Sequence, residues 1–214
     1  MVSMDANIKK AQILTEALPF IKKFSNKTVV IKYGGSALIN PEIKDTIIKD
    51  IVLMKLVGMK PVIVHGGGPD ISSFLKKLNI ESKFVNGLRV TSAETMEVAE
   101  MVLAGKINKQ IVTEIELHGV KAVGISGKDG DTVRAKKIEK DGVDYGFVGS
   151  VESVDPTLVK TLIDNDIIPV IAPIGKDGTG QSYNINADYM AVAIAGSLEA
   201  EKLVFLTDVA GVLK

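Results

Sequence analysis

The chain has 214 residues, of which 46% are hydrophobic, and its 26 lysine and arginine residues balance its 26 aspartate and glutamate residues. This balance gives no net attraction to nucleic acid or to an anionic membrane surface. The absence of cysteine excludes disulfides, thiolate metal ligands and cysteine nucleophiles. Because no apolar run reaches eighteen residues and no signal-peptide pattern is present, we expect a soluble, cytoplasmic protein without a membrane segment.

The first 25 residues differ in pattern from the rest of the chain. Residues 4–24 carry apolar side chains at helical spacing, and no strand precedes them from which the chain could cross over. Such an amphipathic helix either caps the domain or packs against another subunit, and the pattern leaves both options open. We therefore expect two units, at residues 1–25 and 26–214.

Residues 26–214 alternate short apolar runs with longer amphipathic stretches. The runs are too apolar to have a solvent-facing side, which is typical of parallel strands covered on both faces. They lie at residues 27–35, 59–67, 120–126, 167–175 and 201–208. Helices are predicted at 41–58, 69–79, 92–105, 107–119, 155–165 and 186–198. The alternation predicts an α/β fold in which an open, mainly parallel sheet lies between helices.

Two segments break this alternation. Residues 131–153 alternate polar and apolar side chains around a Lys-Asp-Gly sequence, which is a hairpin signature. A second hairpin is predicted near residues 175–186. We expect both hairpins to be antiparallel additions to the parallel sheet.

Glycine clusters follow the first two predicted strands. Gly34 and Gly35 follow the first, and Gly66, Gly67 and Gly68 follow the second, just before a predicted helix. Glycines expose backbone N–H groups, and a helix start adds the positive end of its dipole, so these turns suit phosphate or carboxylate. A tight strand–helix turn explains one cluster equally well, but two clusters after two strands favour an anion site. Neither cluster has the spacing of a P-loop or of a dinucleotide-binding fingerprint.

Lys32 lies inside the apolar strand "VVIKYGG", two residues before the first glycine pair. Burial of an unpaired ammonium is costly, so a lysine in such a strand either reaches water from an edge position or has a function in the site. Together with the glycine amides it would form a cationic cradle for phosphoryl oxygens. Catalysis in such a cradle depends on positioning and electrostatic stabilisation.

Six segments resemble the N-acetyl-L-glutamate kinases of the amino acid kinase superfamily, in order from residue 27 to the end of the chain. They are "IKYGGSAL", "VHGGGPDI", "NGLRVT", "VLAGKINKQIV", "SYNINADYMA" and "LVFLTDVAGVL". "NGLRVT" and "NINAD" together separate this family from the aspartate, carbamate and uridylate kinases. The resemblance implies ATP-dependent phosphorylation of the side-chain carboxylate of N-acetyl-L-glutamate to an acyl phosphate, in arginine biosynthesis.

The resemblance also implies a role for each matching residue. Lys32 would stabilise the charge on the transferred phosphoryl group. Asp188 would orient catalytic lysines instead of acting as a base, since a carboxylate acceptor is already deprotonated at neutral pH. Mg²⁺ would arrive with ATP, held mostly by phosphates and water, so no metal ligands are expected in the protein.

Further residues are implied to bind phosphate, acceptor and nucleotide. The phosphoryl oxygens would be held by backbone amides of the glycine turns, and the acceptor by the second turn, an arginine and an asparagine. The residues implied to bind phosphate are Gly34, Gly35 and Gly67. Those implied to bind the acceptor are Gly67, Gly68, Arg89 and Asn184. Those implied to bind the nucleotide are Thr207 and Asp208.

The helix at residues 4–24 looks like that of the arginine-inhibited members of the family. In those members the helix interlaces dimers into a hexamer. The resemblance therefore implies a homo-oligomer, with residues 1–25 as an interlacing helix, and L-arginine as an inhibitor.

Local patterns offer competing interpretations of several residues. Arg89 stands two residues after a glycine and could be a surface turn residue, and Asn186 could be the N-cap of the next helix. Asp188, in the first turn of that helix, is also what the helix dipole favours. We expect His65 to fill the strand end through a ring hydrogen bond and His118 to cap a helix, with no histidine chemistry.

Members of the family continue past "TDVAGVL" into a portion that supplies more nucleotide contacts, a second catalytic lysine and most of the arginine site. We therefore expect this chain to hold the acceptor-binding lobe and the start of the nucleotide-binding lobe. The alternative to an active kinase is a catalytically silent module that binds the acceptor and self-associates. A kinase for another carboxylate acceptor is a third option, which Arg89 within "NGLRV" disfavours.

Overall fold

The computed structural model describes residues 4–34, 41–140 and 142–207, and its main body is built on one five-stranded sheet. The strands are β1 (Thr28–Tyr33), β2 (Lys60–His65), β5 (Ala122–Ser126), β8 (Ile168–Ala172) and β11 (Lys202–Phe205). They lie in the order β11-β1-β2-β8-β5, and every neighbouring pair is parallel. These are the five apolar runs of the sequence, so the predicted parallel sheet is confirmed.

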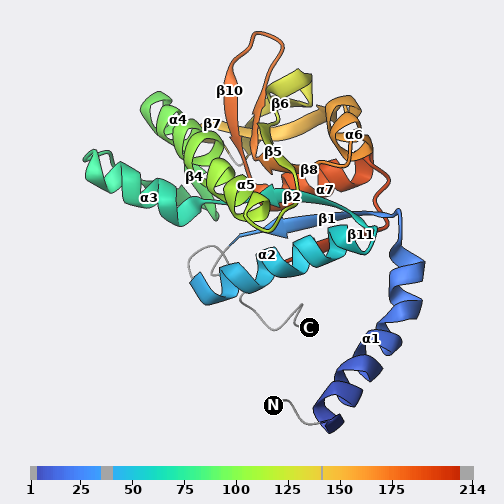
Figure 1. The fold of residues 1–214 in the computed structure, drawn as a ribbon. Coiled ribbons are helices and arrows are strands. Elements are labelled where there is room, and N and C mark those ends of the chain that lie inside the picture. The colour runs from blue at the N-terminus through green and yellow to red at the C-terminus, as the bar shows by residue number, and fades with distance from the viewer. Residues whose placement is uncertain (1–3, 35–40, 141, 208–214) are drawn as a thin grey trace.

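Helices cover both faces of this sheet (Figure 1). α2 (Pro41–Leu56), α3 (Gly68–Lys77), α4 (Ala93–Glu100) and α5 (Asn108–Glu116) pack on one face. α6 (Thr157–Asp164) and α7 (Ala187–Ser197) pack on the other. α1 (Met4–Phe24) extends away from the body (Figure 1). In the part of the chain that the structure describes, no helix is long and apolar enough to span a membrane.

Side chains along each strand alternate between the two cores. In β1, Val29, Ile31 and Tyr33 belong to the core beneath α2 to α5, whereas Val30 belongs to the core beneath α6 and α7. Lys32 is two residues from Val30, so its side chain leaves the sheet on the α7 face. Strand periodicity therefore carries a lysine from a buried strand toward one particular helix.

The two predicted hairpins are present, but they do not extend the parallel sheet as expected. β6 (Val133–Lys140), β7 (Val143–Val154), β9 (Ile174–Lys176) and β10 (Ser182–Ile185) instead form a closed barrel in the order β10-β7-β6-β9. β10 closes it by pairing in parallel with β7, with Asn184 opposite Val148. Closure leaves fewer strand edges exposed than two separate hairpins would.

A short hairpin that the sequence reading missed carries the "NGLRVT" motif. β3 (Lys83–Val85) and β4 (Leu88–Val90) pair in antiparallel fashion around Asn86 and Gly87. Both turn residues have positive φ, 48° and 77°, as a type I′ turn requires. The Asn-Gly pair was the available signal, but strands of three residues are too short to show an alternating pattern.

The helices predicted at 92–105 and 107–119 form one continuous helical segment. Ser92 caps its start, accepting a hydrogen bond from the Thr95 amide. A π-helical stretch, η2 (Met101–Ile107), then joins α4 to α5. The predicted end at Gly105 is wrong because the residue lies inside this π-helix. Stretches of π-helix are rare and occur frequently near functional sites.

The β3–β4 hairpin is attached to the barrel through Gly146. The Thr91 amide donates to the Tyr145 carbonyl, and the Phe147 amide donates to the Thr91 carbonyl. A Cβ at Gly146, where φ is 67°, would lie 2.1 Å from the Thr91 oxygen. We therefore expect Gly146→Ala to lower the free energy of unfolding by about 1–3 kcal/mol beyond its backbone strain.

Gly142→Ala is the matched control for this prediction. Gly142 has φ 68°, and nothing lies within 4 Å of a Cβ placed there. It therefore carries the same backbone strain without the overlap. Urea unfolding of both variants measures the difference, and equal losses would show that Gly146 is not a close attachment point.

Candidate active site

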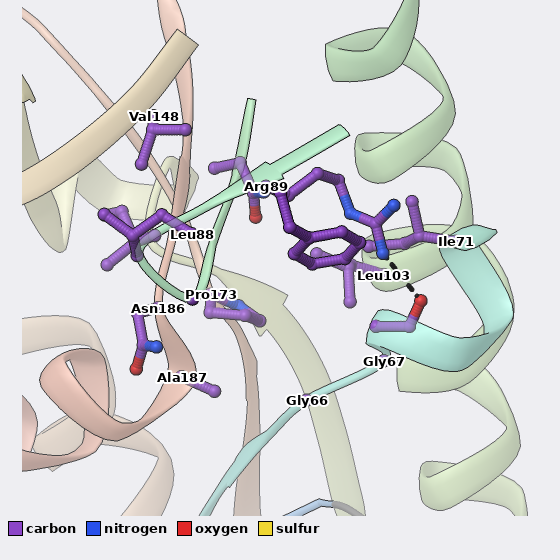
Figure 2. A pocket seen from close by; sticks show the side chains of 15 residues that line it. Gly66, Gly67, Ile71, Leu88, Arg89, Leu103, Val148, Pro173, Asn186 and Ala187 are labelled. Carbon is purple, nitrogen blue, oxygen red and sulfur yellow. Dashed lines mark hydrogen bonds between the residues drawn. The ribbon is translucent and has the colours of Figure 1, made fainter. Parts of the chain in front are cut away.

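A pocket lies beyond the carboxyl ends of β2 and β8, where the sheet meets the barrel and the β3–β4 hairpin (Figure 2). Gly67 and Gly68 follow β2, Arg89 lies on β4 and Asn184 lies on β10. All four predicted acceptor-binding residues line this one pocket. In open α/β sheets, ligands bind outside the carboxyl ends of the strands.

The glycine turn after β2 presents free backbone amides. The Gly66 amide donates to the Tyr33 carbonyl at 2.8 Å, and the Gly67 carbonyl accepts from the Ile71 amide at 3.0 Å. Among the described residues, none accepts from the amide N–H of Gly67 or of Gly68. Because Gly68 begins α3, these two N–H groups form the start of a helix and suit an anion.

Gly67 also packs closely against two side chains of the neighbouring helical segment. A Cβ on this residue would lie 2.3 Å from Cδ1 of Ile107 and 2.7 Å from Cδ2 of Leu103, both on the π-helical stretch. This close packing, and not a left-handed backbone, favours glycine here, since its φ is 170°.

Lys32 and Asp188 form an ion pair at the edge of the site. The Lys32 Nζ lies 3.1 Å from Oδ1 of Asp188, which is in the first turn of α7. Their side chains are 17% and 52% exposed, so the ammonium is largely shielded while the carboxylate faces water. The lysine also lies against Gly34, because a Cβ built there would be 3.1 Å from Nζ. β1 lies between β11 and β2, so the edge-position interpretation of Lys32 is wrong.

Asn186 caps α7 and thereby fixes the position of Asp188. Its Oδ1 accepts from the amides of Asp188 and Tyr189 at 2.8 and 3.3 Å. The N-cap interpretation of Asn186 is therefore confirmed. Asn186 also lines the pocket (Figure 2), so the cap and the pocket wall are the same residue.

Arg89 is held by the protein on several sides. Its Nη2 donates to the Gly68 carbonyl at 2.9 Å (dashed in Figure 2) and to Ser72 Oγ at 2.8 Å, and its Nη1 donates to Ser82 Oγ. The guanidinium lies 4.5 Å from the centre of the Phe84 ring. Arg89 is 6% exposed, and burial lowers the pKa of its guanidinium. The surface-turn interpretation of Arg89 is wrong.

The remaining predicted residues lie at different distances from this pocket. Asn184 lines the pocket, and no described residue bonds to its carboxamide. Thr207 follows β11, next to the end of β1, where the Leu206 amide donates to the Lys32 carbonyl at 3.0 Å. Gly35 and Asp208 lie outside the described residues. Within residues 4–34, 41–140 and 142–207, no cluster of three metal-binding side chains occurs.

Sequence reasoning missed the apolar part of the pocket wall. Many of its members come from the β3–β4 hairpin, the barrel, the π-helix and the loop after β8. They include Phe84, Leu88, Leu103, Val148, Pro173 and Ile185. Only Pro173 had a usable signal, since it directly follows a predicted strand. The wall pairs a small apolar surface with an arginine, an asparagine and free amides, which suits a small carboxylate that also has an apolar group.

His65 ends β2 and is completely buried. Its Nδ1 lies 2.9 Å from the Gly66 carbonyl, which confirms the expected ring hydrogen bond. Its Nε2 lies 3.2 Å from Nδ2 of Asn108. Burial, and to a smaller extent the charge of Lys109, lower the pKa of His65 to about 4, against a raising effect of the Gly66 hydrogen bond.

This low pKa predicts a loss of stability in mild acid. The unfolded chain binds a proton near pH 6.5, which the folded chain accepts only near pH 4, so acid favours unfolding. The contribution is complete above pH 6.5 and is lost progressively as pH falls toward 4. Between pH 7 and 5, the unfolding free energy of the wild type should fall about 2 kcal/mol more than that of His65→Asn.

Urea unfolding at pH 8, 7 and 5 measures this difference. Between pH 8 and 7, where the His65 contribution is nearly constant, the two proteins should change in parallel. Parallel behaviour down to pH 5 as well would show that His65 is protonated as easily in the folded chain as in the unfolded one.

Comparison with known proteins places the chain in a family. Residues 27–214 match the model of the amino acid kinase family. An acetylglutamate kinase of Caldanaerobacter subterraneus subsp. tengcongensis is 60% identical over 207 residues, covering 97% of this chain and 69% of the relative. An acetylglutamate kinase of Heliobacterium modesticaldum is 56% identical, over 97% of this chain and 73% of the relative.

Solved structures agree with this fold. A protein of Streptococcus mutans UA159 aligns with a TM-score of 0.78 and 34% identity, over 87% of this chain and 75% of that one. N-acetylglutamate synthase from Neisseria gonorrhoeae, solved with coenzyme A and N-acetyl-glutamate, aligns with a TM-score of 0.81 and 25% identity, over 99% of this chain and 47% of that one. The chain therefore belongs to the amino acid kinase family and, within it, to the acetylglutamate kinases.

Proposed function

We propose that the pocket beyond β2 and β8 binds N-acetyl-L-glutamate and that Lys32 and the glycine turns stabilise phosphoryl transfer to its side-chain carboxylate. As an acetylglutamate kinase, the chain is a phosphotransferase with ATP as co-substrate. The observation that carries the proposal is the convergence of Gly67, Gly68, Arg89 and Asn184 on one pocket. A structural relative that was solved with N-acetyl-glutamate supports the choice of acceptor.

Arg89 is proposed to bind a carboxylate of the acceptor. An arginine has five N–H donors, and three of them are bound to Gly68, Ser72 and Ser82. Two donors therefore remain in a guanidinium whose orientation is already set. A carboxylate that pairs with such a group loses little entropy on ordering the side chain. Asn184, whose amide has no described partner, would complete this contact.

Lys32 is proposed to act on the transferred phosphoryl group. In the reaction an oxygen of the acceptor carboxylate forms a bond to the γ-phosphorus of ATP, and the bond from that phosphorus to the bridging oxygen of ADP breaks. No proton moves, so no base is needed, and Asp188 positions the ammonium instead. The amides of Gly34, Gly35 and Gly67 would bind the phosphoryl oxygens.

The nucleotide is proposed to enter from the side of β1 and β11. Thr207 lies there, beyond the end of β11, and Asp208 follows it in sequence. Mg²⁺ would be held by the ATP phosphates and by water.

Self-association through α1 is proposed as well, with L-arginine as a regulatory ligand on the strength of the resemblance. α1 extends away from the body (Figure 1), and its apolar side chains are exposed. Ile8, Ile13, Leu14 and Leu18 are each more than half exposed. A contiguous apolar stripe of this kind is typical of a helix that packs against another subunit.

Calorimetric titration with N-acetyl-L-glutamate tests the acceptor site. Arg89→Ala should weaken binding by about 1.5–3 kcal/mol, roughly 10- to 150-fold in Kd, because a charge-assisted contact is lost. Lys32→Ala should leave the affinity within about threefold, since its proposed contact forms in the transition state. Arg134→Ala is the control, because that residue lies on the barrel surface and pairs with Asp131.

Two results would contradict the proposal. Failure of the folded wild type to bind N-acetyl-L-glutamate, with L-glutamate and L-aspartate as comparison ligands, would refute the acceptor. Unchanged binding by Arg89→Ala would remove that residue from the acceptor site even if the acceptor is correct.

Size-exclusion chromatography with light scattering measures the mass of the particle in solution and so tests the role of α1. Leu14→Glu should lower the mass of the particle, because a charge on the apolar stripe opposes its burial. Lys10→Glu, a charge change at an exposed position on the same helix, should leave the mass unchanged. A single-chain mass for the wild type, or equal masses for the wild type and Leu14→Glu, would refute self-association through this stripe.

A further inference from the structure

We propose that His65 and Asn108 are positioning residues that direct the amide N–H of Gly67 toward the acceptor and the transferred phosphoryl group. Neither side chain contacts the pocket directly; they act through the peptide between Gly66 and Gly67. The inference rests on the proposed function, because it assigns a support to one of the groups that would bind phosphoryl oxygens.

The hydrogen bonds define which nitrogen of His65 carries the proton. Nδ1 lies 2.9 Å from the Gly66 carbonyl oxygen, which can only accept, so Nδ1 must carry a hydrogen. With its pKa near 4 the ring is neutral at pH 7, and Nε2 is then an acceptor. Nδ2 of Asn108, 3.2 Å away, is the matching donor. The buried ring is therefore held as the Nδ1–H tautomer.

Asn108 has only one orientation that satisfies its surroundings. Its Nδ2 faces the Val170 carbonyl at 2.8 Å and the Ile125 carbonyl at 3.3 Å, in addition to the His65 ring. Its Oδ1 accepts from Lys109 Nζ at 3.2 Å. A flipped amide would place its oxygen against three acceptors and its NH₂ against an ammonium. The residue is fully buried, so the direction of the donor to His65 is fixed.

The peptide plane transmits this orientation to the site. In a trans peptide the C=O and the following N–H point in opposite directions. Because the Gly66 carbonyl is held against the His65 ring, the Gly67 N–H points away from that ring. Gly67 lines the pocket, and no described residue accepts from its amide. An unbonded N–H with an enforced direction is what a preorganised oxyanion contact requires.

The same helical segment supports the turn from a second side. Leu103 and Ile107 on the π-helical stretch pack where a Cβ of Gly67 would lie, and Asn108 is the next residue in the chain. The helical segment therefore brings two apolar contacts to Gly67 and one hydrogen-bond donor to the His65 ring. His65 contributes a rigid ring between this helix and the glycine carbonyl.

The ring nitrogens of His65 provide the first test. The chain has two histidines, so ¹⁵N signals of the imidazoles are assigned with a single variant, His118→Asn. The expected result at pH 7 is a protonated Nδ1 and an unprotonated Nε2 for His65. A protonated Nε2 with an unprotonated Nδ1 would break the link to Gly66 and overturn the proposal, whatever the acceptor.

Binding of N-acetyl-L-glutamate to two His65 variants provides the second test. The amide nitrogen of His65→Asn occupies the place of Nδ1 and can still donate to Gly66, whereas His65→Phe keeps a ring but has no donor. His65→Phe should bind about tenfold more weakly, as for one misdirected hydrogen bond to a charged group, and His65→Asn within about threefold of the wild type. The Gly67 amide signal should shift on binding in the wild type and in His65→Asn but not in His65→Phe.

The outcomes separate the inference from the proposed function. If the wild type does not bind N-acetyl-L-glutamate, the proposed function fails and the tautomer still decides the role of His65. If the wild type binds and folded His65→Phe binds equally well, the positioning role is refuted. A purely structural role would make both variants equally weak, which would also refute it. His118→Asn is the matched control and should retain wild-type affinity.

Discussion

The candidate site depends on how closely a helix approaches the backbone of the turn after β2. Cδ1 of Ile107 and Cδ2 of Leu103 lie 2.3 and 2.7 Å from the place of a Gly67 Cβ, so a side chain there would displace these two methyl groups. The pocket wall, the start of α3 and the carbonyl that holds Arg89 all meet at this turn. Glycine therefore allows close packing on one side of the turn while its amide stays open on the other.

The two faces of the sheet support different parts of the proposed chemistry. On one face α7 brings Asp188 to Lys32, with its position set by the Asn186 cap. On the other face α5 brings Asn108 to His65 behind the glycine turn. Successive side chains of a strand point to opposite faces of the sheet. Helices on the two faces can therefore contact side chains of neighbouring strands. The charged group and the neutral amides are thus held by separate networks.

Much of the fold followed from local sequence pattern, and each failure has an identifiable physical cause. The spacing of apolar side chains in the strands and helices repeats over enough residues to be recognised. The caps at Ser92 and Asn186 are hydrogen bonds within one helical turn, so they depend only on neighbouring residues. Closure of the barrel depends on β10 meeting β7, a contact between distant segments that no window contains. The π-helix was missed because a glycine such as Gly105 normally indicates a helix end.

The candidate site was predictable to the extent that its residues follow strands. Gly67, Asn184 and Lys32 each stand at or near a strand end, where parallel topology brings ligand contacts together. A binding role for Arg89 could be assigned only through the resemblance of the segment "NGLRVT" to a family. Its burial depends on Ser72, Ser82 and Phe84, which contact it in the fold. Asn108 gave no signal at all, since a polar residue within an amphipathic helix normally faces water.

The position of Asn108 should tolerate few substitutions, although the residue gave no signal in the sequence. Residues that contact ligand are constrained by the ligand's chemistry, whereas Asn108 is constrained by three acceptors from three different strands. Aspartate at this position would keep the shape but place a carboxylate oxygen against carbonyls, and leucine would leave the His65 ring and two strand carbonyls without their donor. The interior therefore restricts this position strictly, although Asn108 does not line the pocket.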